Sequence, residues 1–134
     1  MIRLFLAFTS FLPLKTNHSF GSFIGYLLYL FNAEAKSVSK QNLEICFPGL
    51  SELELKSLLK KVLTETGKGL TESGLIWNQN FTDNAKLIRN INGEHYLDSS
   101  KKTILLVPHT GCWEITGRVL ADKRKVTFMY RPLR

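Results

Sequence analysis

Two apolar runs dominate the beginning of the chain. The first extends from Met1 to Leu14 with one early base, the second extends from Phe20 to Phe31, and a short polar stretch separates them. Neither run reaches the ~18–20 consecutive apolar residues that cross a bilayer comfortably. Three interpretations remain open: a short, imperfect span, a helical hairpin lying in the membrane interface, or two core helices of a soluble protein. Because both runs are rich in Phe, Leu and Tyr, we favour a membrane anchor over residues 1–31.

The next part of the chain has the periodicity of amphipathic helices. Residues Ala33 to Ile45 are predicted to be helical, and Pro48-Gly49 is predicted to form a turn after this helix. Ser51 and Glu54 have the spacing of a capping box. The apolar residues that follow recur at the i, i+3, i+4, i+7, i+8 spacing of one buried helix face: Leu55, Leu58, Leu59, Val62 and Leu63. A core helix is therefore predicted to begin near Ser51.

Three glycines follow that stripe, at positions 67, 69 and 74. Each costs about 1 kcal/mol relative to alanine inside a helix. Close packing of helices is the compensation that we expect for all three.

The last third of the chain changes from helical to strand-like patterning. Thr103–Val107 and Val126–Tyr130 are short, apolar and partly β-branched, and Cys112–Ala121 between them is predicted to be a helix. This order predicts a right-handed βαβ unit. The expected fold class is α/β: N-terminal membrane-associated helices, then the start of a mixed or parallel sheet with crossover helices. Residues 32–134 would be the N-terminal part of a catalytic domain.

The predicted sheet is unfinished. Parallel sheets are covered on both faces, and two strands with one helix do not provide that cover. We therefore interpret the chain as part of a larger protein cut in mid-fold. Expressed alone, it is expected to be inactive and to fold poorly.

Candidate chemistry lies at the turn between the first strand and its helix. His109 follows the strand, Glu114 comes five residues later, and Gly111 permits a tight turn between them. Histidine, with a pKa of about 6.5, is a suitable general base, and a carboxylate can fix its tautomer. Backbone N–H groups around Gly111 can stabilise an oxyanion. Arg131, after the second strand, can reach a substrate phosphate, although a structural ion pair is an equal alternative.

Three motifs carry a resemblance to a known family. They are His-Thr-Gly-Cys-Trp-Glu from His109, Asn-Leu-Glu-Ile-Cys-Phe-Pro from Asn42 and Tyr-Arg-Pro from Tyr130. In this order they resemble the bacterial lipid A biosynthesis acyltransferases, of the His-x4-Glu glycerolipid-type superfamily. Cys112 departs from the pattern, because the family usually has asparagine at that position. A second departure is Ala35-Lys36, where an arginine is common.

The resemblance implies a function and a location. It implies transfer of a fatty acyl chain from acyl carrier protein to a hydroxyl of a lipid A precursor, with His109 and Glu114 catalytic. Gly111 and Arg131 would bind substrate. The implied location is the cytoplasmic face of the bacterial inner membrane, in contact with membrane lipids.

Two other functions remain as alternatives. One is a glycerolipid acyltransferase that uses acyl-CoA, against which Trp113 and the Cys-Phe-Pro element argue. The other is a catalytically silent membrane-binding fragment. The chain has no Gly-x-Ser-x-Gly nucleophile motif, so direct attack by the acceptor hydroxyl fits better than an acyl-enzyme.

Composition narrows the partners. The net charge is +7, and six bases fall in the last segment: Arg118, Lys123, Arg124, Lys125, Arg131 and Arg134. A basic surface suits phospholipid headgroups, phosphorylated sugars or an acidic carrier protein. Without a recognised binding module, no nucleic acid partner is expected.

The number of cysteines indicates the redox compartment of the protein, and the spacing of possible ligands indicates whether it binds a metal. Two distant cysteines are not a disulfide framework and fit a reducing compartment. A metal site built from His95, His109, Cys112 and Glu114 lacks any standard ligand spacing. We expect neither a metal nor a cofactor.

Overall fold

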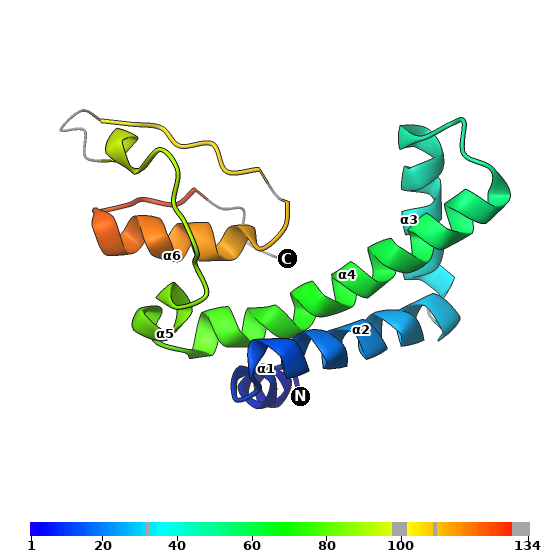
Figure 1. The fold of residues 1–134 in the computed structure, drawn as a ribbon, viewed down its shortest axis with the longest axis horizontal. Helices are drawn as coiled ribbons and strands as arrows, with labels where there is room; N and C mark the ends of the chain where they lie inside the picture. The colour runs from blue at the N-terminus through cyan, green and yellow to red at the C-terminus, as the bar shows by residue number, and fades with distance from the viewer. Residues whose placement is uncertain (32, 98–101, 109, 130–134) are drawn as a thin grey trace. The chain divides into compact units, whose positions relative to one another are not determined.

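The computed structural model describes residues 1–31, 33–97, 102–108 and 110–129, without the side chains of residues 33 and 81. It divides into two compact units, Met1–Asn78 and Gln79–Arg134. Figure 1 shows the helices of both units.

The described residues of the first unit form four helices. They are α1 (Ile2–Ser10), α2 (Leu14–Phe31), α3 (Ala33–Cys46) and α4 (Glu52–Asn78). α4 is the long central element, and α1, α2 and α3 all pack on it, α2 most extensively (Figure 1). Proline separates the helices at two places: Pro13 precedes α2, and Pro48 follows α3. A proline has no N–H for the helical ladder and restricts the residue before it, so both breaks follow from the sequence.

The apolar stripe of α4 forms the core of this unit, as predicted. Leu59 and Leu63 are buried together with Leu43 of α3, and Leu55, Leu58 and Val62 pack against them. The capping box is also confirmed: Ser51 N–H donates to Glu54 Oε2 at 2.9 Å, and Glu54 N–H lies 3.4 Å from Ser51 Oγ. Local pattern was therefore sufficient to locate both the start and the buried face of α4.

Glycines bring α2 and α4 into backbone contact. A Cβ atom added to Gly21 would lie 2.6 Å from the Cα atom of Lys68, and one added to Gly67 would lie 2.5 Å from the backbone nitrogen of Gly25. Gly74 meets α1 in the same way, at Leu6 O, 2.5 Å from an added Cβ. The predicted compensation by close packing is thus confirmed for positions 67 and 74.

Gly69 does not take part in this contact. A Cβ at Gly69 has nothing within 4 Å, so the prediction of close packing was wrong at that position. The i, i+4 spacing of Gly21 and Gly25 is the small-residue pattern that lets two helix backbones approach each other.

A buried polar network joins α1, α2 and α4. Asn17 is fully buried, and its Nδ2 donates to Thr9 O at 2.9 Å and to Thr71 O at 3.0 Å. The Thr71 hydroxyl lies 3.2 Å from Asn17 O in return. His18 of α2 pairs with Glu72 of α4 one residue further along. The polar stretch between the two apolar runs therefore holds three helices in register.

Large apolar side chains remain exposed on α1 and α2. They include Ile2, Leu4, Phe8, Phe23, Leu30 and Phe31, together with Phe11 between the two helices. Among the described residues, no helix combines the length and the apolarity needed to cross a bilayer.

The second unit is smaller and contains short elements around one helix. These are α5 (Phe81–Ala85), η1 (Glu94–Tyr96) and α6 (Trp113–Lys123). α6 buries Val119 and Leu120, and Arg118 donates to Gln79 O at 3.0 Å. The C-terminal end of α6 is tied to η1 by an ion pair between Lys123 and Glu94. The helix predicted over Cys112–Ala121 is confirmed within two residues at either end.

The predicted α/β fold class was wrong. Within the described ranges the structure is helical, with no strand and no sheet. Thr103–Val107 forms no strand, nor do residues 126–129; Tyr130, the last residue of the second predicted strand, lies outside the described residues. Alternating side-chain exposure nevertheless runs along the first segment: Ile104 and Leu106 are about 90% exposed, whereas Leu105 and Val107 are 40% exposed. The short, apolar and partly β-branched composition of these segments predicted strands, but a sheet also needs a second segment in register.

Candidate active site

The turn before α6 carries the described part of the predicted site. Gly111 has a φ of +56°, in the left-handed region that favours glycine, and Thr110 N–H donates to Pro108 O at 2.9 Å. The helix then begins at Trp113, with Cys112 as its N-cap. Gly111 therefore makes the tight turn that its position in the sequence predicted.

Glu114 lies in the first turn of α6 and is partly buried. A carboxylate there is favourable for the helix itself, because the N-terminus of a helix carries a partial positive charge. The structure thus gives Glu114 a fixed place at the start of the helix, directly after the turn at Gly111.

Two of the predicted site residues lie outside the described residues. They are His109, the proposed base, and Arg131, the proposed phosphate ligand. The contact between His109 and Glu114, and the role of Arg131, stay predictions.

A pocket of about 530 Å³ borders α6 on another face. Its lining includes Leu105 of the extended segment and Thr116, Val119 and Leu120 of α6. These lining residues were not predicted from the sequence, although the i, i+3, i+4 spacing of the three helical ones places them on one face. The pocket is mostly apolar and lies on the helix that carries Glu114.

Neither a metal cluster nor a disulfide is present in the described part of the chain. The described residues contain no group of three or more His, Cys, Asp or Glu side chains able to hold a metal ion. Cys46 and Cys112 are both exposed and form no disulfide.

Sequence comparison supplies the family. The model of the bacterial lipid A biosynthesis acyltransferases matches residues 2–134. The chain belongs to this family. The match includes the turn at Gly111, Glu114 and all of the first unit except Met1.

Two curated lipid A acyltransferases are similar to the chain. The lipid A biosynthesis lauroyltransferase of Escherichia coli K12 is 31% identical over 124 residues, which is 90% of this chain and 40% of that protein. The lipid A biosynthesis acyltransferase of Haemophilus influenzae is 26% identical over 119 residues, 86% of this chain and 37% of that protein. The chain thus spans about two fifths of the length of these relatives. No solved structure matches it significantly.

Proposed function

We propose that the protein transfers a fatty acyl chain to a hydroxyl group of a lipid A precursor, with acyl carrier protein as the donor. The observation that carries this proposal is the family match over residues 2–134, within which the His-x4-Glu motif ends at the first turn of α6. The names of both similar proteins support the lipid A pathway.

The proposed mechanism needs one base and no covalent enzyme intermediate. His109 accepts the proton of the acceptor hydroxyl while the hydroxyl oxygen attacks the carbonyl carbon of the thioester. The tetrahedral intermediate collapses, the C–S bond breaks, and the imidazolium returns the proton to the thiolate. Glu114 orients the imidazole and stabilises its charged form, as the carboxylate does in other His–carboxylate pairs.

Neighbouring groups complete the proposed site. The backbone N–H of Gly111 is proposed to stabilise the oxyanion, because Gly111 comes two residues before the start of α6, where partial positive charge favours an anion. Arg131 is proposed to bind an acceptor phosphate.

Transfer assays with the full-length protein test this mechanism. His109→Ala should abolish acyl transfer. Glu114→Gln should keep a low residual rate of transfer, because the glutamate only orients the imidazole and stabilises its charged form. Base catalysis of this kind contributes ~10²–10⁴-fold. Acyl carrier protein and coenzyme A donors are compared in parallel, and a preference for acyl-CoA would favour the glycerolipid alternative. Near-normal turnover by His109→Ala would contradict the mechanism.

We further propose that α1 and α2 bind the protein to the membrane, at the cytoplasmic face of the inner membrane. The support is the exposed apolar surface of these helices and of the turn between them, including Phe31 of α2 at 79% exposure and Phe11 of the turn at 85%. Residues 1–31 also contain no Asp or Glu, so their only charges are basic and suit anionic lipid.

Deleting residues 1–31 would be a poor test of this anchor, because α2 packs on α4 through Gly21 and Gly25. Replacing Phe11, Phe23 and Phe31 by serine leaves that contact intact and removes only exposed side chains. The triple variant should lose most of its sedimentation with vesicles that contain phosphatidylglycerol. Val38→Ser with Ile45→Ser is the control, since both residues are exposed on α3. Equal loss in the control would show that general hydrophobicity, and not this surface, binds lipid.

A further inference from the structure

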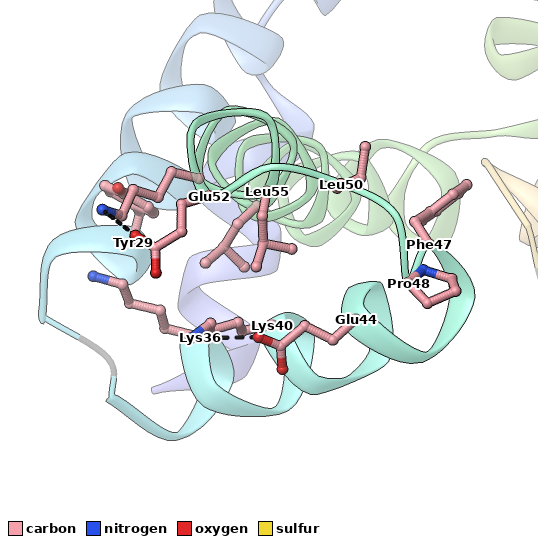
Figure 2. Close-up of a pocket in the computed structure, with 11 residues that line it drawn as sticks. Tyr29, Lys36, Lys40, Glu44, Phe47, Pro48, Leu50, Glu52 and Leu55 are labelled. Carbon is pink, nitrogen blue, oxygen red and sulfur yellow. Dashed lines mark hydrogen bonds and ion pairs between the residues drawn. The ribbon is translucent and has the colours of Figure 1, made fainter.

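The family motif that begins at Asn42 builds part of a pocket in the first unit. This pocket of about 430 Å³ lies between α2, α3 and α4 and is lined at one end by Phe47 and Pro48 (Figure 2). Its volume falls in the range of ~300–1,000 Å³ that is common for small-molecule sites. The proposed acyl transfer chemistry uses none of these residues.

The pocket has an apolar wall. Leu55 projects from α4 into the space beside α3 (Figure 2). Leu59, also in the lining, is buried in the core. Phe47, which is half exposed, and Leu50 extend the apolar surface toward the loop between α3 and α4. Such a surface can cover a short stretch of hydrocarbon.

The rim of the pocket is basic. Three lysines and two glutamates line it. Lys40 pairs with Glu44 at 3.5 Å and Lys56 with Glu52 at 3.3 Å, both as exposed i, i+4 pairs. Exposed pairs of this kind contribute little, so a ligand anion can compete with them.

Lys36 differs from the other two lysines. Its ammonium lies 4.4 Å from the centroid of the Tyr29 ring, and within the described ranges no carboxylate is in ion-pair distance of it. An aromatic ring attracts a cation without bringing an opposite charge to it, as a carboxylate does. Lys36 is therefore the cation of the rim that is most available to an incoming anion.

We propose that this pocket binds the phosphate end of an alkyl phosphate, with the phosphate against Lys36 and the first carbons of the chain against Phe47 and Leu55. Lysine is a common point-charge ligand of phosphate. The alkyl phosphate can come from a bilayer lipid or from a soluble phosphorylated amphiphile. The proposal is independent of the acyl transfer proposed above, because binding is measured without turnover.

Photo-crosslinking of the full-length protein tests the site. The probe is an alkyl phosphate of eight carbons with a diazirine on its chain, used below its micelle concentration. We expect crosslinks in peptides that cover residues 36–59. An excess of octyl phosphate should compete, whereas octanol or inorganic phosphate alone should not, because each supplies only half of the recognition. Competition by octanol equal to that by octyl phosphate would overturn the proposal.

Paired variants separate the site from general attraction to a basic protein. Lys36→Glu should reduce crosslinking at least about tenfold, because it removes one hydrogen bond to a charged group and places a carboxylate beside the phosphate. Lys61→Glu makes the same change of charge on an exposed part of α4 outside the pocket lining and should have little effect. Equal losses in the two variants would mean attraction by net charge and would refute the pocket.

A second pair tests the apolar wall. Phe47→Ser should weaken crosslinking, and Val38→Ser, a similarly exposed residue of α3 outside the pocket lining, should not. Circular dichroism confirms folding of each variant.

A last experiment identifies the source of the alkyl phosphate. The same diazirine is placed on the chain of phosphatidic acid, which is presented in phosphatidylcholine vesicles. Labelling of residues 36–59 from vesicles points to a membrane lipid, and labelling by the monomer alone points to a soluble ligand.

Discussion

Single glycines on α4 have opposite expected effects, although they are only two residues apart. Gly67→Ala would place a Cβ 2.5 Å from the backbone of Gly25, so α2 must move away. Overpacking of this kind costs about 1–3 kcal/mol. Gly69→Ala meets no atom within 4 Å and should stabilise the helix by about 0.5–1 kcal/mol.

Chemical denaturation of both variants, followed by circular dichroism, measures this difference directly. Gly69→Ala is the matched control, because the same change is made on the same helix. If both substitutions stabilise the protein, the close approach of α2 and α4 is not as described.

These glycines also mark what single residues can predict. A glycine inside a helical pattern indicates that something compensates for its cost, and Gly67 and Gly74 confirm this. The residue type does not distinguish them from Gly69, because the compensation lies on another helix. Asn17 is similar: nothing in its local sequence indicates that its amide joins the backbones of Thr9 and Thr71.

At the scale of one element, the capping box at the start of α4 should make the stability of the fold depend on pH. The hydroxyl and then the backbone N–H of Ser51 donate to Glu54 and lower the pKa of that carboxyl below its ordinary value of 4.5. A carboxyl with a lowered pKa in the folded state stabilises the fold above its unfolded pKa, and this contribution is lost as the pH falls through the folded pKa.

Ser51→Ala should therefore raise the pKa of Glu54 toward 4.5. The free energy of unfolding should then fall less on acidification, because protonating Glu54 removes less stabilisation. Titration of the Glu54 side chain by nuclear magnetic resonance measures the shift. Ser73→Ala, whose hydroxyl donates to Gly69 O within α4, is the control and should leave the pKa of Glu54 unchanged. An unchanged pKa in Ser51→Ala would contradict the capping box.

Elements differ in how far the sequence predicts them, for a physical reason. The backbone hydrogen bonds of α4 join residues four apart in the sequence, so its periodicity and its capping box were sufficient to predict the helix. A strand needs a partner elsewhere, and Thr103–Val107 shows the alternation of a strand without belonging to a sheet. At the candidate site, the turn at Gly111 and the position of Glu114 followed from local sequence. The partnership of Glu114 with His109 stays a prediction.

For the molecule as a whole, exposed apolar surface and net charge have opposing effects on self-association. Ile104 and Leu106 are about 90% exposed, and further apolar side chains are exposed on α1 and α2. The net charge of +7 keeps copies of the chain apart at low ionic strength. Added salt screens this repulsion, since the Debye length falls to roughly 10 Å at 0.1 M. The 134-residue chain in mild detergent is therefore expected to associate increasingly as salt is added.

Ile104→Lys combined with Leu106→Lys should reduce this association, because it removes two exposed apolar side chains and adds two charges. Leu105→Lys is the contrasting variant. It adds a charge to the same segment, but Leu105 lines the pocket beside Val119 and Leu120, so a lysine there should loosen the second unit. Sedimentation velocity measures association, and thermal unfolding measures the loosening. If Leu105→Lys and the double variant behave alike in both measurements, the segment does not have one covered and one open side.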